Sequence, residues 1–326
     1  MAILTLDAPS LQERSTSLKR FIVKDALFRN LTFAAALLVL SILFGVFVSL
    51  MIGAAPAFST FGLDFLTTQS WNPVTEKFGA LAPVYGTIIT SLIAMGIAVP
   101  VGIGIAIFTT ELCPVLLRKP IAIAIELLAG IPSIIYGIWG LFVFAPFLQQ
   151  HIQPAIIATF SGVPILKDVF AGPPYGIGVF TAGLILAIMV IPFISSISRD
   201  VFETTPSVLK ESAYALGATT WEVIWNVVLP YSRAGVLGGV MLGLGRALGE
   251  TMAVTFVIGN AHKIAASVLA PGTTISATIA NEFTEAIGDI YTSSLIALGL
   301  ILFVITFIVL AFARYMLMRL NARLGN

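Results

Sequence analysis

The sequence predicts an all-α integral membrane protein with six transmembrane helices and with both termini in the cytoplasm. Three observations lead to this prediction. First, 58% of the 326 residues are hydrophobic and only 10% are charged, a balance that soluble globular domains do not reach. Second, six apolar runs are long enough to cross a bilayer. Third, lysine and arginine are concentrated in every second connection between these runs.

Each span follows from its length and apolar content, because a helix needs about 20 mostly apolar residues to cross the hydrocarbon core. The predicted spans are, in chain order, residues 31–53, 80–109, 121–148, 176–198, 234–259 and 293–317. Residues 1–30 form a basic N-terminal segment, and residues 31–320 form one transmembrane domain. The first apolar run is too long for a signal-peptide core and no clear small-residue cleavage site follows it, so we expect it to be retained.

The basic residues set the orientation, since cytoplasmic connections carry an excess of lysine and arginine. Thirteen basic residues share one side if the N-terminus is cytoplasmic: Arg14, Lys19, Arg20, Lys24, Arg29, Arg118, Lys119, Arg199, Lys210, Arg233, Arg314, Arg319 and Arg323. The opposite side has only Lys77, Lys167 and Lys263. We therefore expect both termini, and the connection at about 199–233, to be cytoplasmic.

The connection at 199–233 carries a spaced motif within the stretch ESAYALGATTWEVIWNVVLP. Its fixed positions are Glu211, Ser212, Ala213, Gly217, Val227, Leu229 and Pro230. A glycine can adopt the positive φ that ends a helix, and a proline can stop a second helical segment, so the loop reads as two short helices with an elbow at Gly217. Such an elbow can sit in a groove of a soluble partner. The alternative is a polar loop that merely links two spans.

Three ionisable residues fall inside the predicted spans: Glu126 in the third, and Arg246 and Glu250 in the fifth. A charge at mid-bilayer costs at least about 2.5 to 3.5 kcal/mol, so it usually faces a cavity or a partner. Arg246 and Glu250 are four residues apart, so on one helix they share a face and can pair. This face either lines the path of an anion or forms a buried structural ion pair.

Other chemistry is poorly supported. The single cysteine, Cys113, and the two histidines, His151 and His262, offer no zinc-binding spacing, and we expect no metal site. No G-x-x-x-x-G-K-[ST] phosphate loop occurs, so this chain is expected to hold no ATP or magnesium itself and to depend on a partner ATPase. The net charge of +1 gives the protein no strong positive potential that would attract nucleic acid.

The loop spacing is similar to the cytoplasmic signature E-A-A-x3-G-x9-I-x-L-P of ABC import permeases, with Ser212 and Val227 as departures. The runs IELLAGIPSIIYGIWGLFVFAP and LGLGRALGETMAVTFVIGN, together with AGPPYGIG, further resemble the PstC-type permeases of bacterial high-affinity phosphate importers, from about Phe78 to the end. The resemblance implies a type I ABC importer permease in the bacterial inner membrane.

The same resemblance implies a set of partners and roles. These are a related PstA-type permease, two copies of a PstB-type ATPase and an external phosphate-binding protein. The loop motif would dock the ATPase, and Arg246 and Glu250 would be the functionally important charged pair of the fifth span.

Two alternatives stay open. A lone arginine does not distinguish tetrahedral oxyanions, so a sulfate or molybdate permease is the nearest one. A secondary transporter shares the charges within the membrane but does not need the loop motif. An intramembrane enzyme would need a nucleophile with a base or paired acids in the spans, which the sequence does not offer, so we expect no enzymatic activity.

Overall fold

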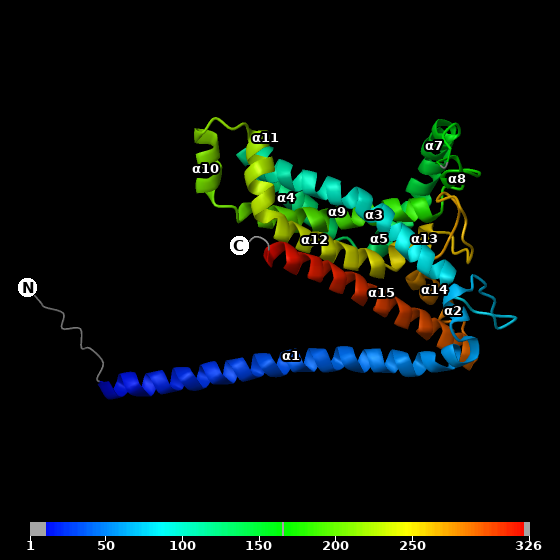
Figure 1. The fold of residues 1–326 in the computed structure, drawn as a ribbon, viewed down its shortest axis with the longest axis horizontal. Coiled ribbons are helices and arrows are strands. Elements are labelled where there is room, and N and C mark those ends of the chain that lie inside the picture. Colours follow the sequence, from blue (N-terminus) through cyan, green and yellow to red (C-terminus); the bar gives the residue numbers. More distant parts are fainter. Residues whose placement is uncertain (1–10, 165, 323–326) are drawn as a thin grey trace, which may run out of the picture. The chain divides into compact units, whose positions relative to one another are not determined.

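In the computed structural model, which describes residues 11–164 and 166–322, the chain is built from helices joined by loops (Figure 1). The longer α-helices are α1 (Leu11–Phe61), α3 (Leu81–Ile107), α4 (Val115–Ala129), α9 (Val179–Glu203), α12 (Leu229–Gly249) and α15 (Asp289–Ala322). Shorter ones are α2 (Asp64–Thr67), α5 (Ser133–Trp139), α6 (Ala145–Phe147), α7 (Gln153–Phe160), α8 (Leu166–Val169), α10 (Ser207–Ala215), α11 (Thr220–Val223), α13 (Met252–Val257) and α14 (Ile275–Glu282). In the described residues, four π-helical turns extend or join these helices without a break: η1 (Phe108–Leu112), η2 (Gly140–Phe144), η3 (Leu148–Ile152) and η4 (Ile224–Val228).

The chain divides into two compact units, Met1–Ile52 and Gly53–Asn326. Most of the first unit is the N-terminal part of α1, which is one unbroken helix from Leu11 to Phe61. From Leu11 onward, the predicted N-terminal segment and the predicted first span therefore belong to the same helix. Residues 1–10 of that segment lie outside the described residues.

The prediction of six spans is confirmed in the described part of the chain. Six helical segments there are long and apolar enough to cross a membrane: Lys24–Phe61, Leu81–Leu112, Ser133–Phe160, Val179–Glu203, Thr220–Gly249 and Asp289–Arg319. Their boundaries differ from the predicted ones, and two segments are displaced along the chain, because the predicted spans 121–148 and 234–259 each contain a break. The third segment consequently begins at Ser133, and the fifth ends at Gly249.

The core of the second unit is centred on α9, the most enclosed of the six segments, which packs against α3, α12 and α4. Helix α12 approaches α9 closely through glycines on one face. A Cβ atom added at Gly235, Gly239 or Gly243 would lie 2.5, 2.8 and 3.0 Å from side-chain atoms of Val201, Ile197 and Ile194. The glycines of α12 thus let the backbones of two helices come close together.

The two helix breaks lie at 130–132 and 250–251 and are brought together by packing between α5 and α13. Gly137 on α5 faces α13, where an added Cβ would lie 2.8 Å from the Phe256 ring. At the first break Pro132 has extended ψ and precedes α5, since proline has no N–H to continue the α4 ladder. At the second break the backbone of Glu250 is extended and ends α12.

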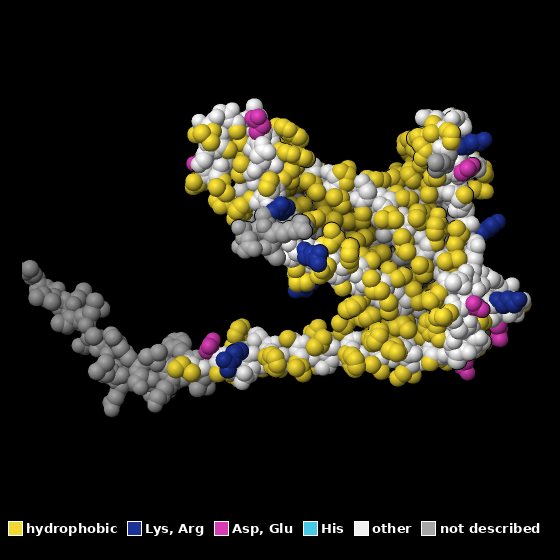
Figure 2. All heavy atoms as spheres, viewed as in Figure 1, with side chains coloured by type: hydrophobic (Ala, Val, Ile, Leu, Met, Phe, Trp, Pro, Cys, Tyr) yellow, Lys and Arg dark blue, Asp and Glu magenta, His cyan; other side chains and the backbone are white. Residues whose placement is uncertain are grey.

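The surface agrees with a membrane environment. Figure 2 shows mainly hydrophobic side chains over the visible face of the second unit, with charged side chains gathered at its two ends. One end carries α10 and α11, together with the C-terminal end of α15; the other carries α7, α8 and α14 (Figure 1). We call these the α10 end and the α14 end.

Candidate functional site

Arg246 and Glu250 lie beside the second helix break, and the structure corrects how they relate to each other. Arg246 is in the last turn of α12, whereas Glu250 has left the helix and has an extended backbone. The prediction that both residues share a face of one continuous helix is therefore wrong, and no ion pair joins them in the described residues. The Glu250 Oε1 atom instead accepts a hydrogen bond of 3.3 Å from the backbone N–H of Ala253 and caps α13.

The side chain of Arg246 is exposed in the single chain and interacts electrostatically with Tyr136 of α5. Tyr136 is buried, and its hydroxyl donates a hydrogen bond of 2.8 Å to the carbonyl of Leu128 on α4. This bond crosses the first helix break and holds α4 and α5 together. An arginine, a tyrosine and two interrupted helices thus meet in one region, an arrangement that in transporters commonly surrounds the substrate path.

Glu126 lies on α4, before the first break, and its carboxylate forms an ion pair of 2.7 Å with Arg199 at the end of α9. In the described residues it forms no ion pair or hydrogen bond with Arg246 or Glu250, so the structure separates it from the other two predicted charges. Glu126 and Arg199 line an open pocket of about 350 Å³ with Arg118, Lys119 and Glu203. The pocket is lined by side chains of both signs of charge.

The spaced motif forms two short helices with an elbow between them, as predicted. Helix α10 ends at Ala215, and Gly217 has the positive φ of 87° that the elbow requires. Thr219 then caps α11, where its hydroxyl accepts from the Glu222 N–H while the Glu222 carboxylate accepts from the Thr219 N–H, a capping box.

Pro230 behaves differently from the prediction that it stops the second segment. Thr220 to Gly249 is one uninterrupted helical segment, and Pro230 lies in the first turn of α12 directly after the π-helical turn η4. The chain accommodates the missing proline N–H by widening the helix at Ile224–Val228 instead of ending it.

The motif residues divide by where their side chains lie. Ala213, Val227 and Leu229 pack into a small apolar cluster, which we call the α10-end cluster. Its buried members are Ala106, Phe202, Val223, Val228 and Val236. Glu211 and Ser212 are exposed, and the Ser212 hydroxyl donates to the Val208 carbonyl of its own helix at 2.7 Å.

The outer surface of α10, α11 and the elbow between them is more apolar than is usual for an exposed loop. Leu216 at the elbow is 90% exposed, and Trp221 and Trp225 stack on each other at 5.5 Å while remaining exposed. An exposed apolar and aromatic surface on a rigid elbow is typical of a protein contact site.

Lys210 of α10 forms an ion pair of 2.5 Å with Glu111 of η1 at the end of α3. The Glu111 side chain is only 8% exposed, so its carboxylate is the more enclosed partner. Sequence reasoning counted Lys210 only as a basic residue and did not single out Glu111.

A second polar network holds the α14 end together. Glu282 accepts hydrogen bonds from Tyr291 and His262, both at 2.8 Å, and from the Trp71 indole N–H, and the His262 ring stacks on Trp71 at 5.3 Å. Burial raises the pKa of the Glu282 carboxyl, but the hydrogen bonds from His262, Tyr291 and Trp71 outweigh it and hold this pKa below its ordinary value. The network joins α14, the start of α15 and two loops.

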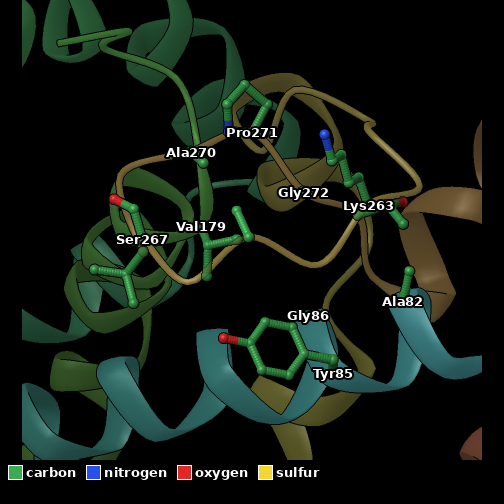
Figure 3. Close-up of a pocket in the computed structure, with 12 residues that line it drawn as sticks. Ala82, Tyr85, Gly86, Val179, Lys263, Ser267, Ala270, Pro271 and Gly272 are labelled. Atoms are coloured by element: carbon green, nitrogen blue, oxygen red, sulfur yellow. The ribbon is translucent and has the colours of Figure 1, made fainter. Parts of the chain in front are cut away.

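A small pocket near this end does not fit a tetrahedral oxyanion. Figure 3 shows the pocket lined by Tyr85 of α3 and Val179 of α9, together with Lys263 and Pro271 of the loop between α13 and α14. Its cavity volume is about 10 Å³, which accommodates one water molecule at most. In the described residues no group of three or more His, Cys, Asp or Glu side chains is placed to hold a metal ion.

Comparison with known proteins identifies the family. A family model described as "binding-protein-dependent transport system inner membrane component" matches residues 98–321. A phosphate transport system permease protein PstC of Mesorhizobium japonicum is 70% identical over 312 residues, covering 96% of this chain and 95% of the relative. The chain belongs to the PstC family of phosphate transport permeases.

Other comparisons agree with membership of the PstC family. The PstC of Pasteurella multocida is 56% identical over 302 residues and is covered to 94%, with 93% of this chain matched. A solved bacterial ABC transporter that imports the acidic polysaccharide alginate contains a chain with a TM-score of 0.60 at 18% identity, covering 93% of this chain and 99% of that one. At this identity the likeness concerns the fold, which is that of an ABC importer permease.

The residues that sequence reasoning missed in this PstC family member are the partners across space. Glu111 and Lys210 lie 99 positions apart, Glu126 and Arg199 lie 73 apart, and Trp71 and Glu282 lie 211 apart. No local spacing connects such pairs. The only signal in the sequence was that charged residues are rare near the ends of the apolar runs, so that each one found there is unusual.

Proposed function

We propose that this PstC family member is the permease subunit of an ATP-driven ABC importer that carries inorganic phosphate into the cell across the inner membrane. The single observation that supports this function best is the loop of α10 and α11. A rigid elbow with an exposed apolar surface, joined without a break to a transmembrane helix, suits a subunit that a separate ATPase drives. The identity to phosphate transport permeases supplies the substrate.

The proposed complex contains three kinds of partner. A related PstA-type permease completes the membrane part, and a dimer of a PstB-type ATPase binds the two permeases. A phosphate-binding protein delivers phosphate from outside. ATP and its magnesium ion bind to the ATPase, while this chain transmits its movement.

The orientation follows from the loop. If the ATPase binds α10 and α11, the α10 end faces the cytoplasm, and the basic bias of the connections supports the same side. The α14 end then faces outward, toward the binding protein. Both termini are cytoplasmic in this arrangement.

We further propose that the region around the two helix breaks lines the phosphate path. Arg246 offers positive charge to the anion, Glu250 fixes the start of α13, and Glu126, held by Arg199, lies nearer the cytoplasmic mouth. This proposal is supported by the exposure of Arg246 in the single chain, in a segment where a charge is expensive.

The transport function is tested with the assembled complex in vesicles, with binding protein and radioactive inorganic phosphate outside and ATP inside. We expect uptake that requires ATP and stops with vanadate. Uptake without ATP would identify a secondary transporter instead. Competition by excess sulfate or molybdate, at a level matching unlabelled phosphate, would favour another oxyanion as the substrate.

The path is tested by Arg246→Gln, which nearly keeps the side-chain size and removes the charge. We expect phosphate uptake to fall by at least about a hundredfold, as for loss of a charged contact of roughly 3 kcal/mol, while the complex assembles normally. Arg314→Gln, at an exposed arginine of α15, is the matched control and should transport normally. Full uptake by Arg246→Gln would remove this arginine from the path.

A further inference from the structure

The ion pair between Lys210 and Glu111 calls for an explanation, because burial of a carboxylate costs desolvation free energy. The Glu111 side chain is 8% exposed and that of Lys210 is 21% exposed, so much of the water around both groups has been removed. Desolvation of this kind is tolerated when the charges are paired at short distance, as they are at 2.5 Å. A neutral pair of similar shape would fill the same place at lower cost.

The position of the ion pair in the fold indicates what it contributes to the structure. Helix α10 otherwise packs against α11 and η4 of its own loop. Toward the membrane segments, its Ala213 joins the α10-end cluster, which also contains Ala106 and Ile107 of α3. Apolar contacts of that kind resist separation but permit sliding. The charge-assisted bond from Lys210 to Glu111 fixes α10 to the end of α3 in one register.

Helix α3 leads from this point to the opposite end of the unit. Its 27 residues span about 40 Å at 1.5 Å per residue. Near its start, the Thr87 hydroxyl accepts a hydrogen bond of 3.0 Å from the Ile275 N–H at the head of α14. The neighbouring Gly86 is so close to the Thr273 carbonyl that an added Cβ would lie 1.8 Å from that oxygen. A displacement of α3 must therefore also displace the loop before α14.

We propose that the Lys210–Glu111 ion pair is the link through which α10 moves α3, and through α3 the segment Thr273–Ile275 at the α14 end. Lys210 and Glu111 are positioning residues for transport and do not touch the phosphate. This inference rests on the proposed role of the loop in binding the ATPase. It adds a second line of transmission beside the continuous helix from Thr220 to Gly249.

The test uses the complete complex in vesicles and four variants: Lys210→Met, Glu111→Gln, the double variant, and Lys210→Arg. Phosphate uptake per assembled complex is measured together with ATP hydrolysis, each with and without phosphate-loaded binding protein. Lys24→Met, at an exposed lysine of α1, is the matched control.

We expect each single neutral variant to lower phosphate uptake at least about fivefold, the lower end of typical coupling between sites. The ATPase should remain bound, and its hydrolysis should respond less to the loaded binding protein. Lys210→Arg keeps the charge and should keep uptake within about twofold of the unmodified protein, as should Lys24→Met.

The double variant distinguishes an ion pair that transmits movement from one that only balances the enclosed charge. If the pair only balances the enclosed charge, removing both charges restores assembly and uptake together. If the pair transmits movement, the double variant assembles but its uptake stays low. Normal uptake in either single variant, or restored uptake in the double variant, would overturn the proposal.

Failure of this link differs from failure of the proposed loop function. If the loop does not bind the ATPase, changes at Leu216 and Trp221 leave ATPase binding intact, whatever the ion-pair variants do. If the loop binds the ATPase but the link is wrong, the Leu216→Ser variant loses the ATPase, while the double ion-pair variant transports normally.

Discussion

At the scale of single residues, Gly217 shows how one backbone conformation determines the shape of a surface. Its φ of 87° lies in the region that residues with a side chain adopt only at a cost. The space around a Cβ at this position is open within the chain, so the constraint is conformational and not steric. The turn places Leu216 outward at the tip of the elbow.

We predict that Gly217→Val lowers ATPase binding, because a β-branched residue strongly resists positive φ and would straighten the elbow at a cost of roughly 1–2 kcal/mol. Gly217→Asn is the matched control, since asparagine adopts this conformation more readily. Co-purification of the ATPase with each variant, at equal amounts of permease, measures the effect. Equal recovery with valine and asparagine would contradict it.

At the scale of elements, the packing of α12 on α9 depends on a row of glycines spaced four residues apart. Gly235, Gly239 and Gly243 all face isoleucine or valine side chains of α9 at distances that leave no room for a methyl group without movement. Gly238, on another face of the same helix, has no atom within 4 Å of an added Cβ. The two faces of α12 therefore differ sharply in how well they tolerate a larger side chain in place of glycine.

This difference gives a paired prediction. Gly239→Leu should destabilise the chain in detergent by about 1–3 kcal/mol, because it overpacks the contact with Ile197. Gly238→Leu should change stability by no more than about 0.5 kcal/mol. Thermal unfolding of the two purified variants provides the comparison, and equal melting temperatures would show that the close approach is not what stabilises this pair of helices.

The Glu282 network joins four elements at the α14 end and predicts a pH dependence. Because the folded-state pKa of Glu282 lies below its ordinary value of 4.5, the carboxylate stabilises the fold above that value, and this contribution is lost as the pH falls through the lowered pKa. Glu282→Gln should thus melt a few degrees lower at pH 7.

The gap in melting temperature between Glu282→Gln and the unmodified protein should be present above pH 4.5 and should narrow as the pH falls through the lowered pKa of Glu282. Glu76→Gln changes an exposed carboxylate at the same end of the unit and serves as the control. Melting temperatures at a series of pH values measure the gap. A gap that stays unchanged as the pH falls through the lowered pKa would show that the network is not stabilised by the ionised carboxyl.

At the scale of the whole molecule, six apolar helical segments and their connections define how the chain crosses the membrane. The orientation is read from single cysteines placed in exposed connections. Ala171→Cys and Ala266→Cys lie at the α14 end, and Ser207→Cys lies at the α10 end. The native Cys113 is 2% exposed and should give little background.

We predict that an impermeant thiol reagent added from outside labels cysteines at 171 and 266 and spares the one at 207. After the membrane is opened with detergent, all three should react, which controls for access. Labelling of Ser207→Cys in sealed cells would reverse the orientation and remove the loop from the side where ATP is present.

Much of this architecture could be predicted from the sequence, for physical reasons that apply to particular residues. Apolar length alone identified the six spans, and the need for positive φ identified Gly217 as an elbow. The break at Glu250 was not predicted, because a long apolar run hides a local change of backbone direction. The same omission led to the incorrect helical pairing of Arg246 with Glu250.

The ion pairs and the Glu282 network were also not predicted, because they depend on which helices become neighbours. Hydropathy determines that α3 and α9 cross the membrane but does not determine their mutual rotation. The close approaches between them, of Gly102 to Ile194 and of Gly183 to Ile93, allow one rotation, and they are contacts between segments far apart in the chain. The partners of Glu111 and Glu126 follow only once those contacts exist.

In the complex proposed above, the unbroken helical segment from Thr220 to Gly249 would act as a lever arm. Its 30 residues extend about 45 Å, with the exposed tryptophans near one tip and Arg246 near the other. A tilt of only about 5° around a pivot at one tip would carry the other tip through about 4 Å, comparable to the width of a phosphate ion. If nucleotide exchange on the ATPase tilted the end that carries the tryptophans by such a small angle, Arg246 at the other end would be displaced by about the size of the ion that it is proposed to contact.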